Sequence, residues 1–486
     1  MPDTTIAELQ SRGHHVVAEH YQRASAETKA LLKEQLSNID WQLLDDLVEQ
    51  LVMNRQDDRT FGDLKPATVY DESTCNEHHP DAIELGHHHL REGKVAAFTV
   101  AGGQGSRLGF SGPKGAMPFV PVTKRTLFEI FAMTIKRAGT IYETTIPWFI
   151  MTSQENDRAT RAFFNKHAHF GLAAGQIHFV QQRMLPVVDF DGKLLMSDKG
   201  ELALAPNGHG GSLDAMAHHH ALQTMRDHGI ETISYFQVDN PLVQPFDPSF
   251  IGMHIKTGSD MSTKVTPKAH DHEPVGNVCL ADDKLTVIEY SEFPKALCEE
   301  RNEQGARQFD TGNLAIHLLD LSFVEKLTKD GLQLPYRRAE KKVSHQNAAG
   351  EIQQPDSPNA VKFETFIFDA LPLANNPLVY RVNRATEFAP VKNATGSDSL
   401  TTSRDALAAR SRQWLSVISA SWAEALTTVE TPIYLLPSRA LNATDVMKSL
   451  GDKDPSDLLK NAQRPSSTTA ERDADGEDDI PIIEIS

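Results

Sequence analysis

A glycine-rich stretch with two basic residues, VAGGQGSRLGFSGPKG, spans residues 100–115 and contains Arg107 and Lys114. Glycine loses more conformational entropy on folding than any other residue, so chains use it where the backbone needs positive φ or a close approach. Backbone N–H groups in such a loop can surround an anion, and two cations seven residues apart can neutralise phosphate charge. The stretch therefore predicts a binding loop for a nucleoside triphosphate.

Two other glycine-containing signatures do not match this stretch. The dinucleotide-binding signature GxGxxG requires a third glycine, and Leu108 stands at that position, which argues against an NAD-dependent oxidoreductase. The Walker A signature GxxxxGK[ST] places a glycine before the lysine, whereas Lys114 follows Pro113 and precedes Gly115. A plain glycine-rich turn would leave Arg107 and Lys114 without a role.

The elements that must position this loop follow a βαβ pattern. From about residue 94, short apolar runs alternate with helical segments, which is typical of a mainly parallel sheet with covered faces. Ligands of such sheets bind beyond the carboxyl ends of the strands. The glycine-rich stretch follows the first strand and Asp239 follows the last, so both are expected at this edge. The predicted strands are 95–100, 145–151, 177–181 and 233–238, and the predicted helices 126–138, 157–169 and 214–228.

The sequence predicts an α/β protein in four parts. A helical segment at 1–88 includes helices at 24–36 and 41–52, with Ser25 and Asp40 as N-caps. A central nucleotide-binding domain with a mixed, mainly parallel sheet follows at 89–398. A small C-terminal domain at 399–462 contains a helix at 402–419 and a strand at 432–436. The last segment, 463–486, has seven carboxylates against two arginines and is expected to be a disordered acidic tail.

Bulk composition limits the classes of partner and location. The net charge of −18 disfavours a nucleic-acid surface, while a few cations in a cleft still allow an anionic small ligand. No run of eighteen apolar residues and no secretory signal are found, so we expect no membrane span. Three cysteines without CxxC spacing fit a cytoplasmic location. The sequence does not indicate an oligomeric state.

Several segments carry a resemblance to a known family. GGQGSRLG…GPKG, at 102–115, resembles the GGxGTRLGxxxPKG signature of the UDP-N-acetylglucosamine pyrophosphorylases, within the eukaryotic-type UDP-sugar pyrophosphorylases. Further similar segments follow in the family's order, so the resemblance covers about 90–415. They are QQRMLP (181–186), APNGHGG (205–211), VDNPLV (238–243), EPVGNVC (273–279), VIEYSE (287–292), FDTGNLAIH (309–317), VKFETFIFD (361–369) and EFAPVKN (387–393).

The resemblance implies a glycosyltransferase-A-like sheet and a uridylyltransferase reaction. UTP and N-acetylglucosamine 1-phosphate would give UDP-N-acetylglucosamine and pyrophosphate. The alternatives within this class are glucose 1-phosphate or N-acetylgalactosamine 1-phosphate as the sugar substrate. A non-catalytic nucleotide-sugar-binding protein is the alternative from another class, although the presence of Arg107, Lys114 and Asp239 argues against it.

The resemblance also implies roles for individual residues. Arg107, Lys114 and Lys392 would be catalytic through the phosphates. Asp239, at the end of a strand, would hold Mg²⁺ or Mn²⁺ beside the phosphates, and its alternative role is that of a turn or cap residue. The UTP-binding residues would be Ala101, Gly102, Gly103, Lys114, Gln182, Gly208, Asp239 and Lys362. The sugar-binding residues would be His209, Gly276, Glu289, Tyr290, Asn313, Phe366, Phe368 and Lys392, with Phe366 and Phe368 on one side of a predicted strand.

Some residues depart from the family pattern or lack a chemical role. His209 stands where the family usually has Asn, Arg183 replaces a usual Gly, and Ser106 replaces Thr. Uridylyl transfer is therefore better determined than the identity of the sugar. The triplets His87–His89 and His218–His220 are contiguous, whereas helical metal ligands lie four residues apart, so both triplets are expected to face solvent without zinc.

Overall fold

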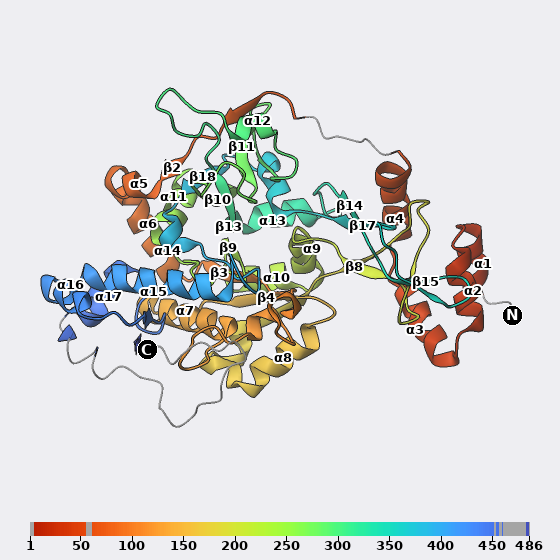
Figure 1. Ribbon diagram of the computed structural model, residues 1–486, viewed down its shortest axis with the longest axis horizontal. Coiled ribbons are helices and arrows are strands. Elements are labelled where there is room, and N and C mark those ends of the chain that lie inside the picture. Colours follow the sequence, from red (N-terminus) through yellow and green to blue (C-terminus); the bar gives the residue numbers. More distant parts are fainter. Residues whose placement is uncertain (1–3, 55–60, 452, 456–458, 460–482, 486) are drawn as a thin grey trace. The chain divides into compact units, whose positions relative to one another are not determined.

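A computed structural model describes residues 4–54, 61–451, 453–455, 459 and 483–485 (Figure 1). Contacts divide the chain into two compact units, and each unit combines segments that are far apart in the sequence. The first unit comprises Met1–Gly62, Gln182–Ala215 and Leu327–Ala370. The second unit comprises Asp63–Gln181, Met216–Lys326 and Leu371–Ser486. Within the described residues, no helix is both long and apolar enough to cross a membrane.

The second unit is built on one large sheet. Strands β4, β3, β9, β13, β10 and β18 follow one another from bottom to top of Figure 1. The whole path runs β2-β18-β10-β13-β9-β3-β4-β5, and β11 joins it beside β13 together with β1 and β12. The bounds are β1 Leu64–Pro66, β2 Tyr70–Asp71, β3 Val95–Val100, β4 Trp148–Thr152, β5 Ile177–Gln181, β9 Thr232–Gln237, β10 Met261–Thr266, β11 Asn277–Ala281, β12 Lys284–Ile288, β13 Gly312–Asp320 and β18 Leu378–Arg381.

Strand direction along this path is mainly parallel, which confirms the predicted fold class. Only β13 breaks the pattern, because it runs antiparallel to both β9 and β10. The carboxyl ends of β3, β4 and β9 therefore share one edge. The strand predicted at 145–151 begins later, at Trp148, because Pro147 has no N–H to donate to a ladder.

Helices cover this sheet and supply much of its core. Thr126 caps α7 by accepting a hydrogen bond from Glu129 N, and Phe128 of α7 meets Phe164 of α8 edge to face. Gly86 of α6 and Gly252 of α11 allow a close helix crossing, because a Cβ at Gly252 would lie 1.6 Å from Ala82 O. The helices of this unit are α5 Glu72–His78, α6 Pro80–Arg91, α7 Leu127–Tyr142, α8 Asp157–Lys166, α10 Ala221–Asp227, α11 Pro248–Lys256, α12 Lys295–Cys298, α13 Leu321–Thr328 and α14 Arg384–Glu387.

One predicted helix ends earlier than the periodicity indicates, and another is interrupted. The helix predicted at 157–169 stops at Lys166, because residues 168–170 adopt left-handed φ values. The helix predicted at 214–228 is broken into α9 (Gly211–His218) and α10, because His220 has φ of 56°. A non-glycine residue with positive φ cannot continue a right-handed helix.

The C-terminal part of the second unit has its own apolar core around Trp414 and Trp422. It contains α15 Leu400–Ser416, α16 Ala420–Thr427, β19 Ile433–Leu435, α17 Ala443–Leu450 and β20 Ile483–Ile485. The expectation of a disordered tail is wrong for its end, because β20 pairs with β19 and buries Ile483 and Ile485. Residues 463–482 of the expected tail lie outside the described residues.

The first unit joins N-terminal helices to strands from the middle of the chain. Ser25 and Asp40 cap α3 and α4 as predicted, by accepting hydrogen bonds from Thr28 N and Leu43 N. Leu32 and Leu44 of these helices share a core with Val188, Val361 and Phe363. The elements are α1 Thr4–Ser11, α2 His15–Arg23, α3 Ala26–Ser37, α4 Trp41–Val48, a π-helix Glu49–Met53, β6 Met184–Pro186, β7 Met196–Ser197, β8 Leu204–Pro206, β14 Arg337–Lys341, β15 His345–Gln346, β16 Ile352–Gln353 and β17 Ala360–Glu364.

Candidate active site

The glycine-rich stretch forms a closed loop that begins where β3 ends. Gly105 N donates to Gly112 O at 2.9 Å, and Lys114 N donates to Gly103 O at 3.1 Å. Gly109 and Gly112 have φ of 71° and 136°, a region that side-chain-bearing residues rarely occupy. The loop thus returns on itself and fixes Lys114 at its far end.

The other glycines of the loop serve two different purposes. A Cβ at Gly105 would lie 2.7 Å from Phe110, and one at Gly115 would lie 2.3 Å from the Phe128 ring. These two glycines are needed for packing inside the protein. A Cβ at Gly103 would meet nothing within 4 Å, so the exposed backbone of Gly103 borders open space. The expected close approach of backbone to a ligand is therefore possible at Gly103.

A buried asparagine, which the sequence did not single out, holds the start of this loop. Asn156 is fully buried after β4, and its Nδ2 donates to Ala101 O at 2.8 Å and to Gly103 O at 3.3 Å. Its Oδ1 accepts a hydrogen bond from Ser153 N at 2.9 Å. The available signal was a polar side chain shortly after a predicted strand, at the same edge as the loop.

Lys114 and Asp239 meet at this edge of the sheet. Lys114 Nζ lies 3.7 Å from Asp239 Oδ2 and 3.4 Å from Val391 O, and the side chains are 17% and 13% exposed. Val391 N donates to Asp239 O at 2.8 Å, which connects residues that are 152 positions apart. Lys114, at the end of the glycine-rich stretch, and Asp239, which follows a strand as predicted, are thus neighbours with cationic and anionic groups facing each other.

Two further predicted phosphate ligands are exposed in the same unit. Arg107 is exposed and makes no hydrogen bond or ion pair within the described part of the chain. Lys392 directly follows Val391, and its Nζ lies 5.7 Å from the centre of the Phe388 ring. Among the residues that the structure describes, neither cation pairs with a carboxylate, so both are available to an anionic ligand.

A buried ionic cluster supports the residue that follows Asp239. Asn240 Nδ2 donates to Glu387 O at 2.8 Å. Glu387 and Lys264 are almost completely buried, with Nζ and Oε1 2.5 Å apart, and Asp247 Oδ2 lies 3.0 Å from the same Nζ.

The pKa values in this cluster follow from burial and from the charges nearby. Burial raises the pKa of Glu387 to about 7, although Lys264 opposes the shift. Burial lowers the pKa of Lys264, but Asp247 and Glu387 outweigh it, so that this pKa lies above its ordinary value. The ammonium therefore stays charged at neutral pH and holds the two carboxylates together.

Three predicted sugar-side residues come together where β11, β12 and β13 meet. Asn313 N donates to Gly276 O at 2.9 Å. A Cβ at Gly276 would lie 2.7 Å from Val287 Cγ1 and 3.5 Å from Glu289 Oε1, so this glycine makes room for the valine and lies beside the carboxylate. Asn313 Oδ1 accepts hydrogen bonds from Thr263 Oγ1 and Ala315 N, whereas Tyr290 is 53% exposed.

In the first unit, the two predicted uracil-side residues are in direct contact. Gln182 is 7% exposed, and its Nε2 donates to Gly208 O and to Asn207 Oδ1. Gly208 has φ of 78°, and a Cβ there would lie 2.3 Å from Thr365 O. Thr365 N donates to Asn207 O at 2.8 Å, so this loop is packed against the segment that follows β17.

His209, Phe366 and Phe368 form an aromatic group in the same unit. The His209 ring centre lies 5.2 Å from that of Phe366 and 5.5 Å from that of Phe368. The predicted strand is wrong, because β17 ends at Glu364 and a 3₁₀ helix begins at Ile367, yet the rings still stack at 5.1 Å. Lys362 lies on β17, opposite Ala339 of β14.

The histidine triplets only partly follow the expectation of solvent exposure. His218–His220 are exposed. His89, however, is 6% exposed, and its Nε2 lies 3.0 Å from Thr232 Oγ1. Burial lowers the pKa of His89, so this histidine is a neutral core residue. Helical periodicity explains the difference, because three consecutive residues of α6 cannot all point away from the sheet.

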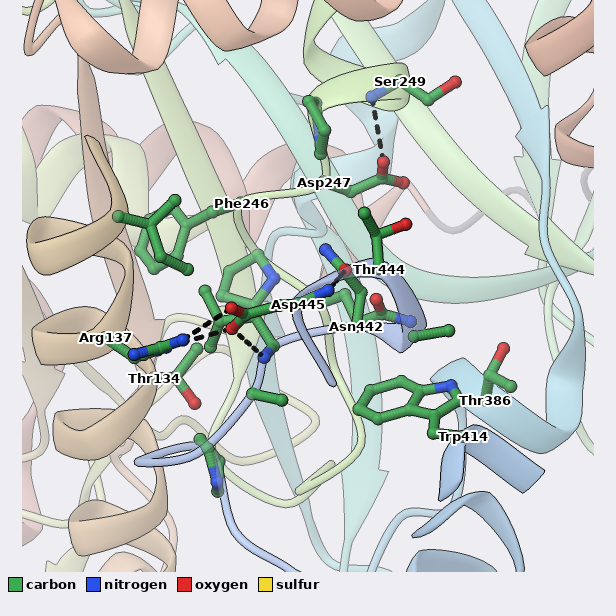
Figure 2. Close-up of a pocket in the computed structure, with 18 of the residues that line it drawn as sticks. Thr134, Arg137, Phe246, Asp247, Ser249, Thr386, Trp414, Asn442, Thr444 and Asp445 are labelled. Carbon is green, nitrogen blue, oxygen red and sulfur yellow. Dashed lines mark hydrogen bonds and ion pairs between the residues drawn. The ribbon is translucent and has the colours of Figure 1, made fainter. Parts of the chain in front are cut away.

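A cavity of about 800 Å³ in the second unit lies elsewhere (Figure 2). Figure 2 shows Arg137 directed at Asp445, with the two hydrogen bonds of this pair at 3.0 and 2.6 Å, and Trp414 further along the wall. None of the sequence-predicted site residues lines this cavity. The candidate active site at the glycine loop is therefore separate from this cavity.

The donors at Asp239 suit one mode of metal binding. Within the described residues, no group of three or more His, Cys, Asp or Glu side chains is arranged to hold a metal ion. A single carboxylate suits Mg²⁺ when phosphates and water supply the other oxygen ligands. Asp239 is partly exposed and lies beside a lysine suited to phosphate, which fits this mode.

Comparisons with known proteins agree on one family. A family described as UTP–glucose-1-phosphate uridylyltransferase matches residues 42–429. UDP-N-acetylhexosamine pyrophosphorylase-like protein 1 of Xenopus tropicalis is 39% identical over 338 residues, which are 68% of this chain and 66% of that protein. UDP-N-acetylglucosamine pyrophosphorylase of Saccharomyces cerevisiae is 37% identical over 345 residues, which are 68% of this chain and 72% of that protein.

A solved structure shows the same fold. The crystal structure of the UDP-N-acetylglucosamine pyrophosphorylase of Trypanosoma brucei, in complex with an inhibitor, has a TM-score of 0.81 at 24% identity. The similarity covers 94% of this chain and 96% of that chain. The chain spans about two thirds of the length of the first relative above. Because the family match extends over most of the residues, this chain belongs to the UTP–glucose-1-phosphate uridylyltransferase family.

Proposed function

We propose that this protein is a uridylyltransferase that forms UDP-N-acetylglucosamine and pyrophosphate from UTP and N-acetylglucosamine 1-phosphate. The observation that carries the proposal is the meeting of Lys114 and Asp239 behind a closed glycine loop, at the carboxyl edge of the sheet. The yeast relative, 37% identical, is named for the same product. This arrangement provides charge for phosphates and no nucleophile of its own.

The reaction needs positioning and charge rather than a general base. An oxygen of the sugar phosphate attacks the α-phosphorus of UTP, a new P–O bond forms, and the bond to the β-phosphate oxygen breaks as pyrophosphate leaves. The nucleophile is already an anion near neutral pH, so catalysis consists of holding two anions together and stabilising the leaving group. Lys114 and Arg107 would bind the triphosphate, and Lys392 would approach the sugar phosphate.

The remaining contacts follow the family resemblance. Ala101, Gly102 and Gly103 would bring backbone against the nucleotide, while Gly276, Glu289, Tyr290 and Asn313 would contact the sugar. Gln182 and Gly208 would contact the uracil, Lys362 the phosphates, and His209, Phe366 and Phe368 the sugar substituents. Asp239 would hold Mg²⁺, which supplies charge neutralisation on the phosphates when bound.

Pyrophosphate release tests this function. The purified chain is mixed with UTP, Mg²⁺ and, in turn, the 1-phosphates of N-acetylglucosamine, N-acetylgalactosamine and glucose. We expect the highest kcat/KM with N-acetylglucosamine 1-phosphate. If pyrophosphate release is highest with another sugar 1-phosphate, that compound is the substrate instead. UTP binding without any pyrophosphate release would indicate a non-catalytic binding protein.

The metal requirement gives a separate prediction for Asp239. Chelation should abolish activity, added Mg²⁺ or Mn²⁺ should restore it, and Asp239→Asn should need a much higher metal concentration, because an amide is a weaker ligand than a carboxylate. Metal titrations of kcat for both proteins measure this. An unchanged half-saturating metal concentration in the variant would place the metal elsewhere.

The sugar preference gives a prediction for His209. Burial, together with the positive charge of Arg337, lowers the pKa of His209 from 6.5 to about 4, so the imidazole is neutral at neutral pH. Its Nδ1 accepts a hydrogen bond from Ile367 N at 3.2 Å. His209→Asn changes one donor–acceptor pair, worth about 1 kcal/mol, so it should shift preference several-fold from glucose toward N-acetylglucosamine 1-phosphate.

The kcat/KM values for both sugars in both proteins measure the His209 effect, and the KM for UTP should stay nearly constant. The ratio should also be flat from pH 6 to 8, because the pKa of His209 lies below this range. An unchanged ratio in the variant would show that His209 only shapes its loop.

A further inference from the structure

One cation in the first unit belongs to the aromatic group but to none of the roles assigned so far. Arg337, at the start of β14, places its guanidinium carbon 4.8 Å from the centre of the Phe366 ring and 5.7 Å from that of Phe368. The two rings lie nearly parallel, with 15° between their planes. A flat guanidinium stacks well on such faces, because it is weakly hydrated and attracted by the ring quadrupole.

A buried carboxylate fixes the orientation of this guanidinium. Arg337 Nε donates to Asp369 Oδ2 at 3.1 Å, and Nη2 donates to Asp369 Oδ1 at 2.5 Å. The side chains are only 11% and 7% exposed. A bidentate pair holds the guanidinium by its edge and leaves its faces for packing. Asp369 also balances the charge of Arg337, so the pair adds no net charge to the aromatic group.

The segment that carries Phe366 and Phe368 determines which nitrogen of His209 carries the proton and where its ring lies. Ile367, between the two phenylalanines, donates its N–H to His209 Nδ1, so the neutral imidazole carries its proton on Nε2. A Cβ at Gly210 would lie 2.8 Å from backbone atoms of Phe366, which shows how closely the two segments pack. Any shift of residues 366–368 would therefore move His209 and the loop that contains Gly208.

We propose that Arg337 is a positioning residue that fixes the rings of Phe366 and Phe368, and with them His209, and so determines selectivity between N-acetylated and hydroxyl-bearing sugar phosphates. This inference rests on the proposed function, in which these three side chains contact the sugar substituents. A rigid apolar wall favours the methyl of an acetyl group and leaves a hydroxyl without partners. Loss of Arg337 lets both rings move and admits water. The hydroxyl then has a hydrogen-bond partner, and the free-energy cost of burying it without one disappears.

Three variants of this pair test the inference. Arg337→Met keeps most of the side-chain length and loses the planar charged group. Arg337→Lys keeps the positive charge but cannot form the two parallel hydrogen bonds to Asp369. Asp369→Asn keeps the side-chain shape and loses the negative charge that anchors Arg337. The readout is the ratio of kcat/KM for N-acetylglucosamine 1-phosphate to that for glucose 1-phosphate. We expect a fall of about tenfold for Arg337→Met, the scale at which apolar pockets discriminate, and smaller falls for the other two. The KM for UTP should change little.

The matched control is Arg338→Met, on the next residue of β14. Arg338 donates to Leu51 O and pairs with Glu340, and it contacts neither ring. We expect its ratio to equal that of the unchanged protein. The double variant Arg337→Met with Asp369→Asn should resemble Arg337→Met alone, because Asp369 acts through Arg337.

The outcomes separate this inference from the proposed function. Equal losses of kcat/KM with both sugars, or an unmoved ratio, would overturn the positioning role while leaving the reaction intact. An unchanged protein that turns over neither sugar would overturn the proposed function itself. Unfolding curves accompany each variant, and if Arg337→Met does not fold, Arg337→Lys and Asp369→Asn decide the question by the same ratio.

Discussion

Lys114→Ala is expected to lower turnover by about 10²-fold or more, because it removes a cation placed to stabilise charge on the leaving pyrophosphate. The side chain is 17% exposed and held between Asp239 Oδ2 and Val391 O, so its ammonium is oriented before any ligand arrives. Steady-state pyrophosphate release at saturating UTP measures the effect. Lys114→Arg should recover part of the loss, because it restores the charge in a different shape.

Arg107→Ala should also lower turnover strongly, but without a change in stability, because Arg107 is exposed and makes no ion pair with any other described residue. Lys136→Ala is the control, since Lys136 is an exposed lysine on α7. Its turnover should match that of the unchanged protein. Near-normal turnover of Lys114→Ala would contradict the role assigned to the glycine loop.

Lys264→Met is expected to destabilise the second unit by about 3–5 kcal/mol, because it leaves buried carboxylates without their cation. Lys264 is fully buried, and Glu387 and Asp247 both lie within 3.0 Å of its Nζ. Glu387→Gln should cost less, because Asp247 still pairs with the lysine. Denaturant unfolding followed by circular dichroism gives the midpoints, with Lys256→Met, which removes the exposed pair with Asp81, as a control that should change little.

The effect of Lys264→Met should depend on pH in a defined direction. Burial raises the pKa of Glu387 to about 7, above its unfolded value of 4.5. A raised carboxyl pKa favours the folded state below pH 4.5, and this contribution is lost as pH rises through 7. Without Lys264 the pKa rises further, so the variant should lose more stability at pH 8 than at pH 5.5. A loss that is equal at both pH values would show that the carboxylates do not titrate in this cluster.

The sequence alone determined the central fold and the edge of the sheet at which the glycine-rich stretch and Asp239 lie. Strands 95–100 and 177–181 were predicted to the residue. For the first, VAAFTV, the reason is that a buried parallel strand is a nearly continuous apolar run that local sequence reveals. That the glycine-rich stretch and Asp239 share this edge followed because the carboxyl ends of parallel strands lie together, whereas the contact of Lys114 with Asp239 came from the structure. The individual roles of the site residues remain predictions that the variants above test.

Tertiary structure alone decided how distant segments combine. Residues 182–215 and 327–370 join the N-terminal helices in one unit, because Val188, Val361 and Phe363 complete the core that Leu32 and Leu44 begin. No local pattern marks such a core, because the apolar residues that form it lie in segments far apart in the sequence.

The side-chain contacts that hold the site residues in place could not be identified from the sequence for the same reason. Asn156 contacts Ala101 across 55 positions, Lys114 reaches the Val391 carbonyl across 277, and Arg337 meets Asp369 across 32. A polar side chain gives no local sign of the partner that satisfies it. Its partner is fixed by burial, because a buried polar group without a hydrogen bond costs free energy, and only the folded chain determines which groups are buried together.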